Sequence, residues 1–256
     1  MEIFDSLVQK SILKVITRKK CLWAEYSQVD IELDLLEAAM QQGNYRYLHL
    51  LSGHDLPLKT QNQIHDFFDK HSEEFITVIA GEKLLRRQRY YARYTRYKHP
   101  LLKISNFRNS KTLKIFDELL VRIQVLFRMN VQNKRNTKHW GFRDGWTWFS
   151  ITKEFANYIL SQRSYIQSIF KDAKAPDEFL MATLAYNSTF FKRLYPKDKE
   201  TGYGSMRYID WNRGKPYNFQ KEDFSRLISS NCMFARKFDE TIDNNIIEQI
   251  YQYLEK

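Results

Sequence analysis

The sequence has few cysteines and no long apolar run, and both shortages narrow the class of protein. Two cysteines occur, Cys21 and Cys232, which lie far apart and match no metal-ligand spacing. We therefore expect buried free thiols rather than a disulfide or a metal centre. No apolar run approaches the roughly 18 residues of a membrane-spanning helix, and no signal peptide opens the chain. We expect a soluble, cytoplasmic protein.

Repeats, low-complexity tracts and linkers are also missing, which favours one folded domain over residues 1–256. The 256 residues fit one large domain, since domains usually run to roughly 50–250 residues. Hydrophobic residues make up 43% and aromatic residues 15% of the chain, which is unlike the composition of disordered proteins. The chain is therefore expected to bury a substantial core.

Acidic residues are outnumbered by lysine and arginine, and the resulting formal net charge of +11 predicts an anionic partner. The tract at residues 83–108 is rich in Lys and Arg, contains no acid, and is interleaved with Tyr90, Tyr91, Tyr94 and Tyr97. Such a tract could stack on the bases of RNA, face an anionic membrane, cover a diphosphate, or be a solvated basic surface. The sequence alone leaves these alternatives open.

Alternating helix and strand patterns predict an α/β fold. Helix patterns occupy residues 27–42, 60–70, 113–127, 153–162, 179–185, 221–229 and 244–254. Strand patterns occupy residues 47–51, 75–80, 146–151 and 207–211. We expect Ser27 to cap the first helix, and the apolar run 47–51 suits a strand buried on both faces of a parallel sheet.

The polar turn that follows this strand pattern is the first candidate site. Ligands of open α/β sheets bind beyond the carboxyl ends of strands, so Asp55 is placed to meet a polar ligand group. The alternative is that Asp55 only caps a turn and that Thr60 only begins the next helix.

Adjacent acids mark the second candidate site. Asp177 and Glu178 follow Pro176 at a predicted helix start, where the unpaired N–H groups favour carboxylates. Two neighbouring acids cannot point the same way, so one of them is expected to face a cleft. A carboxylate there could act as a general base on a hydroxyl group.

The third candidate site is the segment 231–240. Phe234 and Phe238 would anchor it in the core, with Arg236 and Lys237 between them. Lys237 is well placed to neutralise a phosphate. The alternative is a surface ion pair with Asp239 or Glu240, which would contribute little to stability.

Four motifs, in order, resemble the core-2/I-branching β-1,6-N-acetylglucosaminyltransferase family, which also contains the protein xylosyltransferases. They are YLHLLSGHDLPLKT (47–60), PDEFLMATL (176–184), MRYIDWNRGKPY (206–217) and FARKFDE (234–240). The resemblance covers about residues 23–240. It implies an A-type nucleotide-sugar glycosyltransferase fold, which is a Rossmann-like mixed sheet flanked by helices.

The resemblance also implies an activity and its site residues. The expected reaction is inverting transfer of GlcNAc or xylose from a UDP-sugar to a glycan or polysaccharide hydroxyl, in surface polysaccharide biosynthesis. Glu178 matches the catalytic base of the family. On the donor side the implied residues are Trp23 near the uracil, Asp55 near the sugar, and Lys237 with Arg213 or Lys215 at the diphosphate; on the acceptor side they are Trp211 and Glu82.

Family members lack the Asp-x-Asp metal motif of other A-type enzymes, and this sequence also lacks it. The resemblance thus implies no divalent metal and no cofactor beyond the UDP-sugar co-substrate. Expected partners are that donor, a glycan or lipid-linked polysaccharide acceptor, and an anionic membrane touched peripherally at its inner face. Nucleic acid binding through residues 83–108 is the alternative that the resemblance disfavours.

One departure from the family concerns the start of the domain. The family domain begins with a strand, a helix and a second strand that ends in a His-x-Asp segment, whereas Met1 aligns just after that point. We therefore expect an N-terminally truncated fold. It would have weak stability, be completed by oligomerisation or a partner, or be a catalytically impaired remnant.

Overall fold

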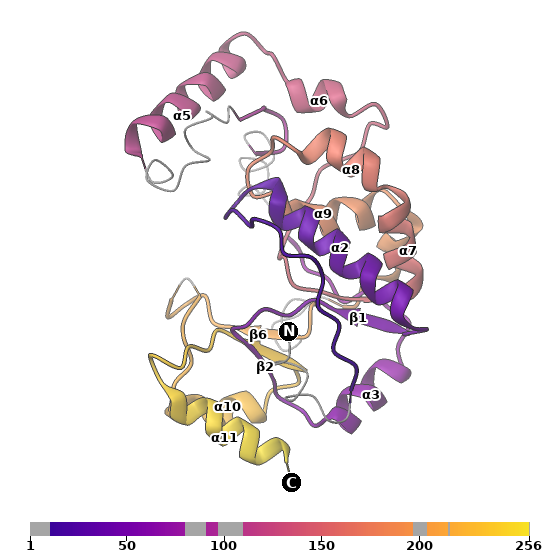
Figure 1. Ribbon diagram of the computed structural model, residues 1–256, viewed down its shortest axis with the longest axis vertical. Coiled ribbons are helices and arrows are strands. Elements are labelled where there is room, and N and C mark those ends of the chain that lie inside the picture. The colour runs from indigo at the N-terminus through magenta and orange to yellow at the C-terminus, as the bar shows by residue number, and fades with distance from the viewer. Residues whose placement is uncertain (1–10, 80–90, 97–109, 197–203, 215, 256) are drawn as a thin grey trace.

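The computed structural model describes residues 11–79, 91–96, 110–196, 204–214 and 216–255 (Figure 1). These residues form helices and small sheets, which confirms the mixed α/β class predicted from the sequence. The described strands fall into three sheets of two, three and two strands and do not join into one Rossmann-like sheet.

Most predicted helices are present close to their expected positions, and two more occur between them. The described α-helices are α2 (Tyr26–Gln42), α3 (Gln61–Asp69), α5 (Lys111–Leu126), α6 (Val131–Arg135), α7 (Lys153–Ser161), α8 (Arg163–Phe170), α9 (Asp177–Tyr186), α10 (Phe224–Ile228) and α11 (Asn244–Leu254). Helices α6 and α8 were not predicted. The short turns η3 (Thr189–Arg193) and η4 (Lys221–Asp223) are 3-10 helices.

Local sequence signals set some helix starts but not all. Thr60 forms a capping box at α3, because its Oγ1 accepts from the Gln63 N–H while the Gln63 side chain accepts from the Thr60 N–H. The prediction that Ser27 caps α2 is wrong, since α2 already begins at Tyr26. The Ser27 hydroxyl instead accepts from the Leu22 N–H at 2.9 Å.

The strands pair mainly in antiparallel fashion. Strand β1 (Tyr47–His49) pairs with β5 (Ser150–Thr152), and β3 (Val78–Ile79) pairs with β4 (Asp144–Gly145), both antiparallel. In the third sheet β7 (Phe234–Arg236) lies between β2 (Asp55–Pro57), its antiparallel neighbour, and β6 (Arg207–Ile209), its parallel neighbour.

The observed strand β1 therefore differs from the strand predicted at residues 47–51. The strand is antiparallel to its neighbour, it stops at His49, and only Leu48 of its three residues is buried. The antiparallel partner is supplied by residues about a hundred positions away, which the local apolar run cannot specify.

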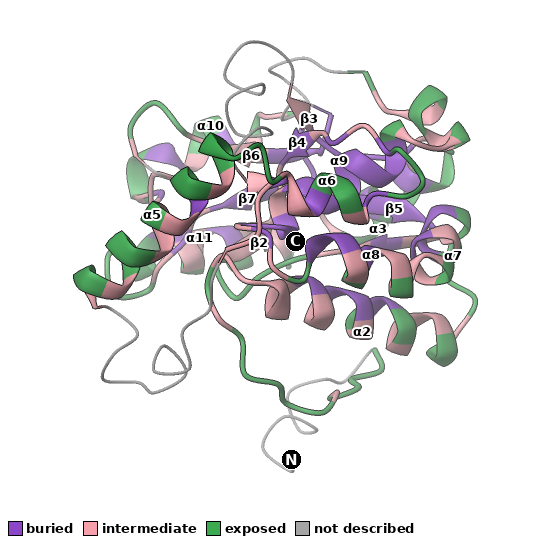
Figure 2. Cartoon of the chain, turned by 90° about the horizontal axis from the view of Figure 1, so that it is seen from above, coloured by how far each residue is buried: buried purple, intermediate pink, exposed green. Residues whose placement is uncertain are grey.

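Three apolar clusters hold the elements together. The largest packs α2, α7, α8 and α9 against β1 and β5 around Leu33, Phe149, Phe155 and Phe179. A second joins α10 and α11 to the β2–β7–β6 sheet, and a third lies under α3. Figure 2 shows α9 buried over most of its length, with the buried strands β4 and β5 nearby.

Cys232 is buried, as predicted, but Cys21 is exposed, because it lies in a stretch before α2 that has no regular structure. Among the described helices, none combines the length and the apolar character that a membrane span requires.

Candidate active site

The loop Trp146–Trp148, between β4 and β5, joins the segments that carry most of the predicted site residues. Its three side chains point to three partners on different elements. Trp148 contacts β7, Thr147 contacts α9, and Trp146 contacts Trp211, which follows β6.

Trp148 covers a buried ion pair between β7 and β2. The guanidinium carbon of Arg236 lies 3.6 Å from the centroid of the Trp148 ring, and its Nη1 lies 3.1 Å from Asp55 Oδ1. The pair forms because Asp55 and Arg236 are directly opposite in the antiparallel register of β2 and β7. The side chains of Asp55 and Arg236 are only 2% and 9% exposed, and Asp55 Oδ2 also accepts from the Ser52 N–H at 2.6 Å.

A second buried arginine lies near the same carboxylate. Arg207 in β6 is fully buried, and its Nη1 donates to Ser150 Oγ at 2.8 Å. Burial lowers the pKa of Arg207 to about 9, and the Asp55 carboxylate opposes that shift. Burial likewise lowers the pKa of Arg236, again against the effect of Asp55. The Asp55 carboxylate thus pairs with Arg236 and also favours the charged form of Arg207.

Thr147 fixes the start of α9. Its hydroxyl donates to Asp177 Oδ2 at 2.8 Å, and Asp177 is buried in the first turn of the helix. Glu178, the next residue, is half-buried, so the two acids differ in exposure. Glu32 in α2 is also buried. Its pKa is raised well above the ordinary value, mainly by burial and to a smaller degree by the nearby Asp177 carboxylate.

Trp146 lies next to the predicted acceptor residue Trp211. The two ring centroids are 5.9 Å apart with an interplanar angle of 53°, and 43% of Trp211 is exposed. An exposed aromatic face supported by a second ring is a common platform for a sugar ring, because it offers apolar area with little side-chain freedom.

Trp23 is 81% exposed and lies beside the start of α9. Ala24 follows it, and its carbonyl accepts from the Ala175 N–H at 3.0 Å. Both alanines have positive φ, at 58° and 47°, which a residue with a side chain rarely adopts. Such outliers gather at functional sites, where the surrounding structure holds them in place.

Lys237 follows β7 directly and is half-buried. Its backbone is held by two hydrogen bonds. The Lys237 N–H donates to the Tyr217 carbonyl at 3.4 Å, and the Lys237 carbonyl accepts from the Phe219 N–H at 2.9 Å. Its ammonium forms no ion pair with any described carboxylate, but its charge acts on Asp239, whose pKa is lowered mainly by hydrogen bonds from Thr241 and to a smaller degree by Lys237.

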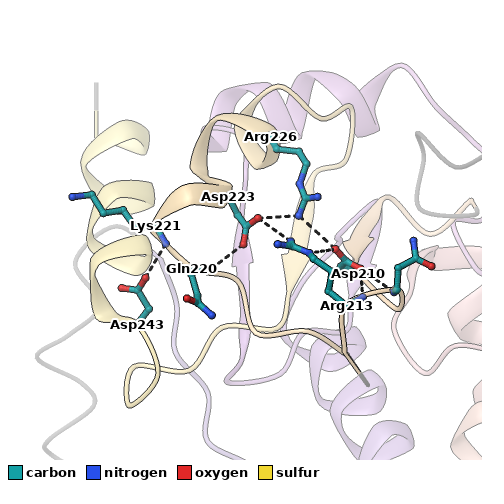
Figure 3. A network of polar contacts seen from close by, with 8 residues as sticks. Asp210, Arg213, Gln220, Lys221, Asp223, Arg226 and Asp243 are labelled. Atoms are coloured by element: carbon teal, nitrogen blue, oxygen red, sulfur yellow. Dashed lines mark hydrogen bonds and ion pairs between the residues drawn. The ribbon is translucent and has the colours of Figure 1, made fainter.

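Arg213 belongs to a separate charge network, shown in Figure 3. Its Nε lies 2.7 Å from Asp210 Oδ2, its Nη2 lies 2.8 Å from Asp223 Oδ1, and Arg226 contacts the same two carboxylates. Its guanidinium carbon also lies 3.9 Å from the Tyr217 ring centroid. Arg213 is therefore already engaged by two acids. The other predicted residues, Lys215 and Glu82, lie outside the described residues.

Sequence reasoning missed the residues that connect the site. Trp146 and Trp148 were assigned to a strand over residues 146–151, whereas β5 begins only at Ser150. Arg236 was noticed only as a neighbour of Lys237, and Arg207 only as the start of a strand. The one available signal was the Trp-x-Trp spacing, which places two large aromatic rings around a single threonine.

The basic tract 83–108 lies mostly outside the described residues. In its described part the Tyr91 ring faces Lys174 Nζ at 4.8 Å, and Arg96 Nη2 pairs with Glu118 at 3.1 Å and with Asp117. These contacts are to the chain itself, and they leave the predicted role of the tract untested.

Comparison with protein families gives one match. The model of a family described as Core-2/I-Branching enzyme matches residues 9–231, which is most of the chain. Among curated proteins, none matches the chain.

Proposed function

The chain belongs to the Core-2/I-branching enzyme family, which is a family of glycosyltransferases, and we propose that it moves a sugar from a UDP-sugar to a glycan or polysaccharide hydroxyl. The proposed sugar is GlcNAc or xylose, and the proposed setting is surface polysaccharide biosynthesis in the cytoplasm, at the inner face of the membrane. The observation that supports this most is the loop Trp146–Trp148, which contacts the proposed donor, base and acceptor segments at once.

Glu178 is the proposed general base. Its carboxylate takes the proton of the acceptor hydroxyl while that oxygen forms a bond to C1 of the donor sugar. The bond from C1 to the diphosphate oxygen breaks, and UDP leaves with its electron pair from the opposite face, so the anomeric configuration inverts. The Thr147–Asp177 hydrogen bond supports this role, because it fixes the first turn of α9 on which Glu178 stands.

Lys237 is the proposed cation at the leaving diphosphate. Fixed cations can stabilise the negative charge that develops on the departing group without a metal ion. The buried Arg236 and Arg207 add to the positive potential of the same region, and Asp55 contributes by positioning Arg236 rather than through a free carboxylate. The engagement of Arg213 by two acids favours Lys215 as the second cation.

The two exposed tryptophans are the proposed contact surfaces for the substrates. Trp23 would stack on the uracil, and Trp211, supported by Trp146, would carry the acceptor sugar together with Glu82. Both rings are connected to the start of α9, Trp23 through the Ala24–Ala175 bond and Trp211 through the loop Trp146–Trp148.

Changing Glu178→Gln tests the proposed base directly. We expect turnover with UDP-GlcNAc or UDP-xylose and a glycan acceptor to fall by at least about 100-fold, since general base catalysis contributes about that much. Affinity for UDP, measured by calorimetry, should stay nearly unchanged. Glu154→Gln is the matched control, because Glu154 holds the same second position in α7 as Glu178 does in α9.

Retained turnover in the Glu178→Gln variant would remove Glu178 as the base. An equal loss in the Glu154→Gln control would show that the effect arises from helix stability rather than from catalysis.

A further inference from the structure

Helix α5 presents its apolar face to solvent, which is the reverse of an ordinary surface helix. Its exposed apolar residues are Ile115 (68%), Leu119 (51%), Ile123 (38%) and Leu126 (76%), continued after the helix end by Phe127 (68%). At about 3.6 residues per turn these side chains fall on one side of the helix. Val121, the buried residue of α5, lies on the opposite side.

The polar side of α5 is the side that faces the protein. The Gln124 side chain donates to the Thr95 carbonyl at 2.7 Å and accepts from the Thr95 N–H at 3.1 Å. Arg96 pairs with Asp117 and Glu118, and its own N–H donates to the Asp172 carbonyl. These polar contacts, together with the buried Val121, therefore attach α5 to the protein with its apolar face outward.

The same contacts leave the outer surface of α5 positively charged. Both acids of the helix, Asp117 and Glu118, are paired with Arg96. The exposed cations Lys111, Lys114, Arg122 and Arg128 form no ion pair with any described carboxylate. Lys111 and Arg122 lie along one border of the apolar face, as the helical spacing requires.

We propose that the apolar face of α5 binds the surface of a bilayer that contains anionic phospholipids. An apolar face bordered by lysine and arginine is the pattern of helices that lie in the headgroup region, where the apolar side enters the acyl boundary and the cations meet lipid phosphates. The position of α5 allows this, because it stands at the edge of the molecule in both views (Figures 1 and 2). The net charge of +11 acts in the same direction.

Cosedimentation with vesicles tests the proposal. The protein is expected to bind vesicles of phosphatidylglycerol and phosphatidylcholine in equal amounts and to bind pure phosphatidylcholine vesicles far more weakly. Leu126→Glu and Phe127→Glu should each lower partitioning by about tenfold or more, since each removes a large apolar side chain from the bilayer. Ile242→Glu is the matched control, because Ile242 is 51% exposed on another part of the surface.

The electrostatic part has its own test. The double change Lys111→Gln and Arg122→Gln should weaken binding to the anionic vesicles by about tenfold or more, because each cation near the surface contributes measurably. Lys70→Gln, at an exposed lysine after α3, should leave binding unchanged. Circular dichroism confirms that every variant is folded.

Three results would overturn the proposal. The first is equal binding to anionic and neutral vesicles, and the second is full vesicle binding by Leu126→Glu. The third is a wild-type chain that does not bind vesicles and instead sediments as a dimer, with Leu126→Glu sedimenting as a monomer. That result would assign the apolar face to a second copy of the chain.

Discussion

Single residues in the proposed active site include buried ionisable groups, which are either paired across two elements or favoured in the neutral form. The Asp55–Arg236 pair joins β2 to β7, whereas the buried Glu32 of α2, which packs against α9, is disfavoured as a carboxylate by burial and then by Asp177. Buried charges cost free energy unless they are paired or neutralised, so these groups fix the arrangement of the site rather than simply stabilising the fold.

Removing one member of the buried pair should cost more than removing both. Asp55→Asn leaves the Arg236 guanidinium uncompensated, and we expect a loss of about 3 kcal/mol in the free energy of unfolding. The double variant with Arg236→Met should be more stable than the sum of the single changes predicts. Urea unfolding of the four proteins measures the coupling, and simple additivity would mean that the pair does not interact.

The pKa of Glu32 predicts how stability depends on pH. The folded pKa lies well above the ordinary value of 4.5, so the stability contribution of the neutral carboxyl is complete below that pH and is lost as pH rises toward the folded pKa. Glu32→Gln keeps a neutral group at every pH. It should stabilise the protein at pH 7 by at least about 1 kcal/mol and have little effect at pH 4.

Thermal unfolding at both pH values checks this prediction. Glu37→Gln, a change at an exposed position of the same helix, is the control. Destabilisation by Glu32→Gln at pH 7 would show that the folded protein holds Glu32 as a charged, satisfied carboxylate.

At the scale of elements, the sequence predicted the helices whose signals are local and failed for strands whose partners lie far away in the chain. Helix α3 was predicted from the apolar residues on one of its faces and from Thr60 at its start, and α9 because Pro176 and two acids mark its start. The strands of three residues take their pairing from distant partners: β1 pairs with β5, and β2, predicted as a turn, exists because β7 lies beside it. The loop Trp146–Trp148 escaped prediction for the same reason, since each of its contacts joins residues at least 30 positions apart.

The loop also yields a prediction for catalysis. Thr147→Val keeps the shape of the side chain but removes the hydroxyl that donates to Asp177. We expect kcat to fall by about tenfold while UDP affinity is kept, because the start of α9 loses its orientation. Asp177→Asn, which can still accept a hydrogen bond from Thr147, should retain more activity than Thr147→Val. Equal activity of Thr147→Val and the wild-type chain would remove this residue from the positioning of Glu178.

At the scale of the whole molecule, the family and the charge agree with each other. The proposed transfer from a nucleotide-sugar needs positive potential at the diphosphate, and in the proposed site the buried arginines around β7 would add to it in a chain of net charge +11. Strand β1 has one described neighbour, β5, and hollows of about 360 and 580 Å³ lie along it. The weak stability or oligomerisation expected from the sequence stays a prediction.

Calorimetric titration with UDP, UDP-GlcNAc and UDP-xylose, in buffer containing EDTA, tests the central claim most directly. Saturable binding of UDP and of at least one UDP-sugar is expected, unchanged when Mn²⁺ replaces the chelator and lost in Lys237→Ala but not in the exposed control Lys192→Ala. An absence of binding for every nucleotide in both buffers, or binding that requires Mn²⁺, would contradict a metal-independent UDP-sugar transferase.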